Sequence, residues 1–253
     1  MMSDQEALFE YLLRLGDNAL VLGHRLSEWC GHAPALEEDL ALSNVALDLI
    51  GQTQLWLNLA GEVEGKGRDA DKLAYLRDAR DFRNILLVEQ PNGDFAVTMA
   101  RQFFFDAWHY LLLRELAGSK DGRIAEIAAK SLKEVTYHLE RSRDWVLRLG
   151  DGTEESHRRM QAAIDDLWMY TGELFEADEI DRAMLREGLG PDPAALHEPW
   201  LGLVKATFEE ATLSLPQPGW AQRGGKRGIH SEHLGYILAD LQFLQRAYPN
   251  ATW

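Results

Sequence analysis

Four acidic residues stand where a paired-metal site could use them. Asp17, Asp48, Asp106 and Glu134 lie in the stretches LGDNALVL, ALDLIG, FFFDAWHY and LKEVTYHL, which are largely apolar. A di-iron bundle places one acidic ligand on each of two helices and a Glu-x-x-His pair on each of the other two, because side chains three residues apart can share a metal. The interval from Asp17 to Asp48 is similar to that from Asp106 to Glu134, which suggests a duplicated helix hairpin.

The histidines that this pattern needs are missing. Gly51 stands three residues after Asp48, and Tyr137 stands three residues after Glu134. His138 is displaced by one position, roughly 100° around a helix. Glycine supplies no ligand, and tyrosine would have to be deprotonated to bind a metal.

Asp106 and His109 do have the required spacing, but on a helix where the pattern needs only a carboxylate. The alternative to a di-iron site is a set of former ligand positions, each satisfied by hydrogen bonds or by Lys or Arg partners, since an unpaired buried carboxylate is too costly to keep ionised. The sequence favours this alternative, with no metal ligand and no catalytic residue in the chain.

His230 and His233 in GIHSEHLG could be a metal pair, but no further ligands with suitable spacing accompany them. We therefore interpret Ser231 as a helix cap followed by Glu232 at the positive end of the helix dipole. The sequence contains no Walker motif, no Gly-x-Ser-x-Gly and no Gly-x-Gly-x-x-Gly after a strand.

The composition is that of an acidic globular protein. Its 253 residues include 26 Lys and Arg against 41 Asp and Glu, a net charge of −15, which disfavours nucleic acid and anionic membranes as partners. A single cysteine, Cys30, rules out an intrachain disulfide and indicates a reducing compartment. The first twenty residues fit neither a signal nor a transit peptide, and no stretch approaches the ~20 apolar residues of a membrane span. We expect a soluble, cytoplasmic protein.

The elements that must position these residues are helices. Apolar residues recur three and four apart, and Gly and Pro separate the segments. The pattern predicts an all-α protein, a single ferritin-like domain over residues 1–253 with a four-helix core and additional C-terminal helices. The long helices are expected over 4–29, 36–60, 94–116 and 121–149, a shorter segment over 72–88, and further helices over 154–175, 178–187, 193–211 and 233–247.

Long stretches of the sequence also carry a family resemblance. LRLGDNALVLGHRLSEWCGHAPALEEDLALSNVALDLIGQ, NILLVEQPNGDFAVTMARQFFFDAWH, LKEVTYHLERSRDW, ELFEADEID and GGKRGIHSEHLG occur in order along nearly the whole chain. They closely resemble the C subunits of the ring-1,2-phenylacetyl-CoA epoxidases of bacterial aerobic phenylacetate degradation.

The resemblance implies a structural, ferritin-like subunit that pairs with a related catalytic A subunit, which carries the di-iron centre. In that family the complete monooxygenase inserts one oxygen atom of O2 into the aromatic ring of phenylacetyl-CoA, with electrons from an NADPH-dependent flavin and iron–sulfur reductase subunit. We accordingly expect no cofactor in this chain. The apolar breadth of the second and third long helices agrees with a hetero-oligomer.

A coenzyme A ester carries several phosphate charges, so a chain of this net charge could contact it only through clustered Arg or Lys. The segment LRDARDFRN places Arg77, Arg80 and Arg83 three apart, on one face if it is helical. The resemblance also implies that acyl-CoA lies near the interface of the A and C subunits. On that basis the candidate acyl-CoA contacts are Arg80, Asp81, Phe82 and Arg83, then Asp181 and Arg182, with Lys226 and Arg227 of the RGGKRG loop as an alternative phosphate site. The other interpretation is a solvated face with internal Asp–Arg pairs.

Two other functions stay open at this point. One is a purely scaffolding helical protein with no ligand contact. The other is a stand-alone carboxylate-bridged di-metal oxidase or iron-binding bundle, which would use Asp17, Asp48, Asp106, His109, Glu134 and His138.

Overall fold

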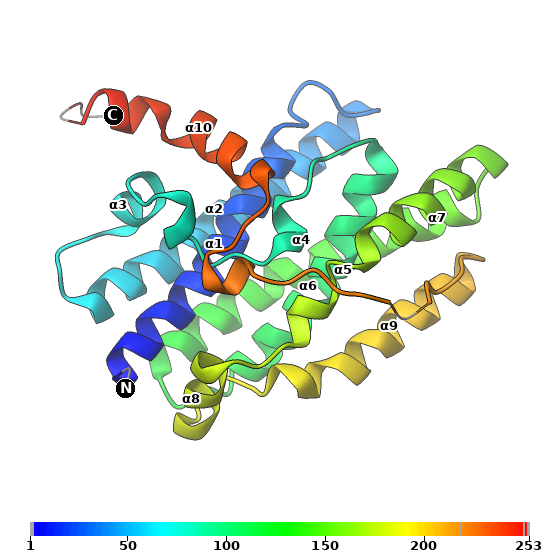
Figure 1. Ribbon diagram of the computed structural model, residues 1–253. Coiled ribbons are helices and arrows are strands. Elements are labelled where there is room, and N and C mark those ends of the chain that lie inside the picture. Colours follow the sequence, from blue (N-terminus) through cyan, green and yellow to red (C-terminus); the bar gives the residue numbers. More distant parts are fainter. Residues whose placement is uncertain (1–2, 218, 250, 252–253) are drawn as a thin grey trace. The chain divides into compact units, whose positions relative to one another are not determined.

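The computed structural model describes residues 3–217, 219–249 and 251 (Figure 1). All regular elements in these residues are helices, which confirms the all-α prediction. The chain divides into two compact units, one formed by residues 1–90 with 223–253 and one by residues 91–222. The single-domain organisation stays a prediction.

The first unit is built around the first predicted hairpin. A capping box between Ser3 and Glu6 starts its first helix, and left-handed Gly65 ends the second. The two helices approach closely at Gly16, where an added Cβ would lie 2.5 Å from the side chain of Leu57. The elements of this unit are α1 (Asp4–Ser27), α2 (Leu36–Glu64), α3 (Ala70–Tyr75), η1 (Ala79–Asp81), α4 (Leu86–Glu89), η4 (Gly225–Arg227) and α10 (Glu232–Ala247).

The second unit contains the other predicted hairpin and an aromatic core. Phe104 and Trp200 are fully buried, and the indole N–H of Trp200 donates a 3.0 Å hydrogen bond to the carbonyl oxygen of Phe104. This bond satisfies the buried indole and fixes the ring. The elements are α5 (Phe95–Leu116), α6 (Gly122–Gly150), α7 (Glu154–Trp168), η2 (Gly172–Phe175), α8 (Glu179–Glu187), η3 (Pro193–Leu196) and α9 (His197–Glu210).

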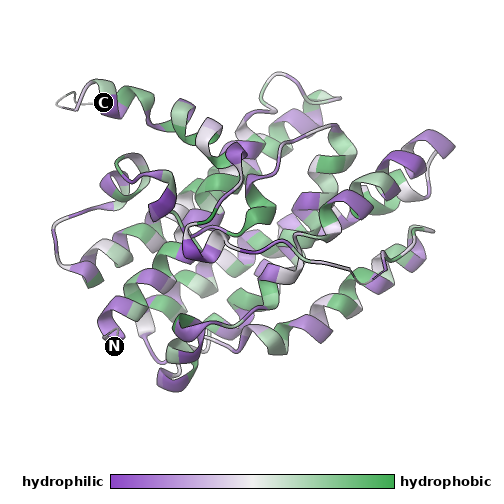
Figure 2. Cartoon of the chain, viewed as in Figure 1, coloured by the Kyte–Doolittle hydropathy of each residue, from purple (hydrophilic) through white to green (hydrophobic). Residues whose placement is uncertain are grey.

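The segment over residues 72–88 is shorter and more broken than a single helix. It forms α3, the 3-10 turn η1 and the short helix α4, because Asp78 and Asp81 cap η1 reciprocally. Each helix carries both hydrophobic and hydrophilic residues along its length (Figure 2).

Over the described residues, no helix has the length and apolar character needed to span a membrane.

Candidate functional site

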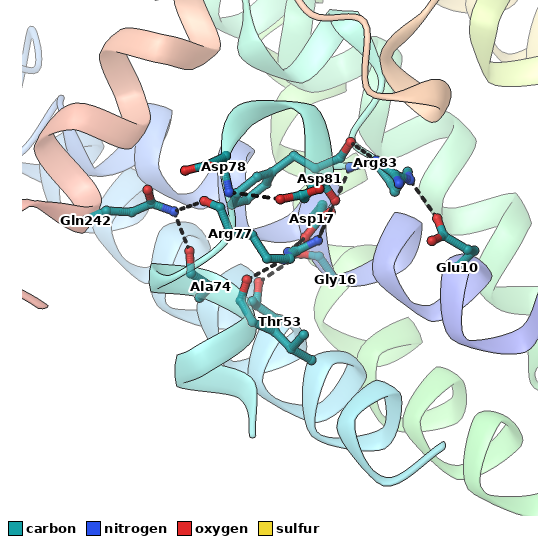
Figure 3. Close-up of polar contacts among 12 residues, drawn as sticks. Glu10, Gly16, Asp17, Thr53, Ala74, Arg77, Asp78, Asp81, Arg83 and Gln242 are labelled. Carbon is teal, nitrogen blue, oxygen red and sulfur yellow. Dashed lines mark hydrogen bonds and ion pairs between the residues drawn. The ribbon is translucent and has the colours of Figure 1, made fainter. Parts of the chain in front are cut away.

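Asp17 is engaged by an arginine in the interior of the first unit. Its carboxylate, on α1, is fully buried and receives two donors of the Arg77 guanidinium, with Arg77 Nη1 3.0 Å from Asp17 Oδ2 and Nη2 in contact with Oδ1 (Figure 3). The backbone N–H of Arg83 donates to the same Oδ2 at 2.8 Å. The guanidinium therefore takes the place beside Asp17 that a metal cation would need.

The Arg77 side chain is held from several directions. Its guanidinium lies 4.3 Å from the ring centre of Phe82, a cation–π contact, and donates to the carbonyl oxygen of Asp81 at 3.0 Å. Gln242 on α10 donates to the carbonyl oxygens of Ala74 and Arg77 at 3.0 and 2.9 Å (Figure 3). These bonds hold α10 against the segment that contains Arg77.

Asp48 on α2 and Glu134 on α6, the second acidic position of each hairpin, are only half-buried. Gly51 is exposed, and a Cβ added there would meet nothing within 4 Å. Tyr137 is 51% exposed. A histidine at either position would therefore extend from an exposed face of its helix.

Asp106 and His109 lie on α5 in the interior of the second unit. Gln102 donates to one carboxylate oxygen of Asp106 at 2.7 Å, and the Ser142 hydroxyl of α6 donates to the other at 2.8 Å. Burial raises the pKa of Asp106 from 3.8 to about 6, although the His138 ring and both hydrogen bonds oppose the shift. The Asp106 carboxyl group therefore stays protonated to a higher pH than an exposed aspartate would.

The pKa of His109 shifts in the opposite direction in the same interior. Burial, and then the charge of His138, lower its pKa from 6.5 to about 3. No described residue hydrogen-bonds its Nδ1, and its ring packs 4.9 Å from that of Phe105. His109 is thus a neutral histidine, which is the protonation state that a metal requires.

The donor set nevertheless does not fit a paired-metal centre. Within residues 3–217, 219–249 and 251, no group of three or more His, Cys, Asp or Glu side chains could hold a metal ion. Asp17 is occupied by Arg77, and the carboxylate of Asp106 is occupied by neutral hydrogen-bond donors. Sequence reasoning missed Gln102 and Ser142, although the spacing of Gln102 four residues before Asp106 could have indicated a shared helix face.

The candidate acyl-CoA contacts around η1 point in different directions. Phe82 is fully buried, so its ring cannot stack on a ligand. Arg83 pairs with Glu10 at 2.6 Å, and the Asp81 carboxylate accepts the backbone N–H of Asp78 at 3.2 Å. Arg80 remains exposed.

The weaker pair, Asp181 and Arg182, is also engaged. Asp181 is buried and caps α8 together with Asp178, whose N–H it accepts at 3.1 Å. The Arg182 guanidinium donates to the carbonyl oxygen of Ala177 at 3.1 Å. Both residues therefore stabilise the N-terminal end of α8.

Arg80 and Arg227 are brought together at one hollow of about 650 Å³ in the first unit. The hollow is lined by Ala79, Arg80, Arg227, Gly228, Ile229, His230, Ser231, Glu232 and Gly235. Lys226 is half-buried and does not line it.

The start of α10 agrees in position with the predicted cap. The helix begins after Ser231, but the Ser231 hydroxyl makes no cap hydrogen bond. His230 contacts the buried carboxylate of Glu89 instead, with its Nδ1 2.9 Å from Glu89 Oε2.

Comparison with known proteins gives two findings. A family model described as phenylacetic acid catabolic protein matches residues 1–253. The chain is also 54% identical over 246 residues to the C subunit of the 1,2-phenylacetyl-CoA epoxidase of Escherichia coli (strain K12), an alignment that covers 97% of this chain and 99% of that protein.

Proposed function

Because the chain belongs to the phenylacetic acid catabolic protein family, we propose that it is the non-catalytic, structural subunit of a phenylacetyl-CoA ring 1,2-epoxidase. In this role it supports a catalytic A subunit that holds the di-iron centre, while a reductase subunit supplies electrons. The complex works in the cytoplasm in aerobic phenylacetate catabolism. The chain brings no cofactor of its own.

The ion pair of Asp17 with Arg77 carries this proposal. A metal centre needs carboxylates free to bind a cation, and here a guanidinium already neutralises the buried carboxylate. If the Arg77 guanidinium left its place, the buried carboxylate of Asp17 would carry an uncompensated charge. A stable fold and a bound metal therefore require different partners for the same carboxylate. The arrangement favours stability over metal chemistry at this position.

The exposed face of α2 supports a structural role. Leu40, Leu47 and Ile50 are 58%, 65% and 37% exposed at spacings that bring them to one side of the helix. Adjacent apolar side chains of this kind are characteristic of surfaces that another protein covers. We assign this face, with Leu36 at its start, to contact with the catalytic subunit.

Metal analysis and size-exclusion chromatography test the proposal together. The isolated chain, after dialysis against a chelator, should contain far less than one equivalent of iron or manganese and show no oxygenase activity. The chain coexpressed with its catalytic subunit should elute as one complex that contains iron. Two retained equivalents of iron per isolated chain would instead favour a stand-alone di-metal protein, and separate elution at micromolar concentration would contradict the structural role.

A further inference from the structure

A pocket of about 580 Å³ in the second unit has a wall of aromatic rings. It is formed by the end of α7, by η2, by α9 and by the segments 215–217 and 219–221. The ring centre of Trp200 lies 5.7 Å from that of Trp168 and 5.1 Å from that of Phe175. Phe175 in turn contacts the His197 ring edge to face at 4.9 Å. These four residues make up one continuous aromatic row, in a pocket large enough for a ligand.

The aromatic row is fixed by the core of the second unit. Trp200 is buried, its indole N–H is bonded to the carbonyl oxygen of Phe104, and its ring centre lies 5.9 Å from that of Phe104. Trp168 packs edge to face on the same Phe104 ring at 5.7 Å. The rings of Trp168, Phe175 and His197 are half-buried and line the pocket. A ligand would therefore meet ring faces that are already in place.

A further tryptophan, Trp220, lies at the edge of this pocket. Its side chain is 74% exposed, the largest exposed fraction among the described large hydrophobic residues. The backbone beside it is held, because the N–H of Gln222 donates to the carbonyl oxygen of Met169 at 2.8 Å. A Cβ added to Gly172 would lie 2.8 Å from the Cβ of Ala221, so this segment packs directly on η2. An exposed tryptophan on a fixed backbone is typical of an interface hot spot.

The charges of the pocket favour a cation. Among the described residues that line it, Asp165 is the only carboxylate and none is Lys or Arg. Asp165 is exposed, and its hydrogen-bond donor is the neutral amide of Gln161 at 3.0 Å. The stretch 160–204, which supplies most of the wall, contains ten Asp and Glu against two Arg. The faces of tryptophan rings also attract positive charge. An arginine side chain matches both features, because its planar guanidinium stacks on aromatic rings and pairs with carboxylates.

We propose that this pocket docks an arginine-bearing segment of a partner protein, with the guanidinium on the tryptophan rings and near Asp165. A site for a small molecule encloses most of its ligand, whereas Trp220 stands open to solvent at the edge of this pocket. Arginine and tryptophan are also the residue types most enriched at protein interfaces. The pocket shares no residue with the apolar face of α2, so it is a second protein contact of the chain that goes beyond the proposed function.

Nuclear magnetic resonance of the isolated chain, labelled with ¹⁵N at its tryptophans, tests the pocket at pH 7. The probe is an acetylated and amidated Gly-Arg-Arg-Gly peptide, which should shift the indole signals of Trp168 and Trp220 in a saturable way. Trp220→Ala should weaken the dissociation constant of the peptide about 10-fold, as expected for a truncated aromatic anchor. Asp165→Asn should weaken it about 2- to 5-fold, because it removes one charge of an exposed pair.

Matched controls separate the pocket from general charge and aromatic content. Asp166→Asn changes the neighbouring exposed carboxylate, which does not line the pocket. Tyr236→Ala removes a ring that is 67% exposed on α10 of the first unit. Both variants should bind the peptide as tightly as the unchanged chain. The same peptide with citrulline in place of arginine keeps the shape without the charge, and it should bind at least 5-fold more weakly.

Three outcomes would overturn the proposal. One is equal affinity of the arginine and citrulline peptides, or of the Trp220→Ala variant and the unchanged chain. Another is tighter binding of tetramethylammonium than of the peptide at the same indole signals, which would assign the pocket to a small organic cation. The third is a shift of these signals with protein concentration alone, which would assign it to a second copy of the chain. The proposed function is tested separately, by iron content and by assembly with the catalytic subunit.

Discussion

Arg77 and Asp17 form a buried two-point ion pair across 60 positions of the sequence. We expect Arg77→Ala to lower the free energy of unfolding by about 3–5 kcal/mol, because it leaves the Asp17 carboxylate buried and uncompensated. Urea unfolding of the isolated chain at pH 7 measures the change. The matched control is Arg83→Ala, which breaks a partly exposed pair with Glu10 and should cost only about 1 kcal/mol. Equal losses in the two variants would contradict this account.

Asp106 should make the stability of the chain pH-dependent. Its folded pKa of about 6 lies above the unfolded value of 3.8, so its contribution is present below pH 4 and is lost as the pH rises through 6. Asp106→Asn removes this dependence and can keep both hydrogen bonds. Relative to the unchanged chain, the variant should gain on the order of 3 kcal/mol between pH 4 and pH 7.5. A constant difference across this range in urea unfolding would disprove the assignment.

His109 should act with the opposite sign. Its folded pKa of about 3 lies below the ordinary 6.5, so protonation favours the unfolded chain and stability falls as the pH drops below 6.5. His109→Gln should therefore lose less stability than the unchanged chain between pH 6.5 and pH 4. Nuclear magnetic resonance of the folded chain provides a direct check, because a His109 ring that titrates near pH 6.5 would be incompatible with its burial.

The apolar face of α2 should matter for assembly and not for folding. Leu47→Lys places a charge at the centre of this face and should weaken association with the catalytic subunit more than 10-fold. The free energy of unfolding of the isolated chain should change by less than about 0.5 kcal/mol, because Leu47 is exposed there. Leu185→Lys, an exposed leucine on α8, is the control and should leave the complex intact. Analytical ultracentrifugation of the coexpressed pair measures both.

Local sequence signals predicted most of the helices well, although the helix expected over 154–175 ends at Trp168 and is followed by the 3-10 turn η2. The starts at Asp4 and Leu36 agree with α1 and α2, and Leu116 is the last residue of α5 as expected, because caps, glycines and apolar spacing act over a few residues. The family inferred from the long matching stretches is also confirmed. Ser231 precedes α10 as predicted, but its hydroxyl makes no cap hydrogen bond, while its backbone N–H donates to Glu89.

The partners of the candidate site residues could not be read from local spacing. Arg77, Arg80 and Arg83 seemed to share one helical face, but η1 is a capped 3-10 turn. That turn sends Arg77 inward to Asp17 and directs Arg83 to Glu10, while Arg80 stays exposed. Each partner is distant in sequence, and a single sequence carries no signal for such pairs. The same limitation hid the position of Arg227 beside Arg80.

The first unit is assembled from both ends of the chain, with Glu89 and His230 in contact across 141 positions. During synthesis, the ribosome must therefore add the whole second unit before the residues that complete the first unit emerge. At typical bacterial elongation rates this interval is about 7–28 s. The contiguous second unit can fold during that time, whereas α1 and α3 wait for their contact with α10. Newly made chains therefore pass through a stage in which the surface that α10 covers is exposed, and we expect truncations that remove α10 to aggregate.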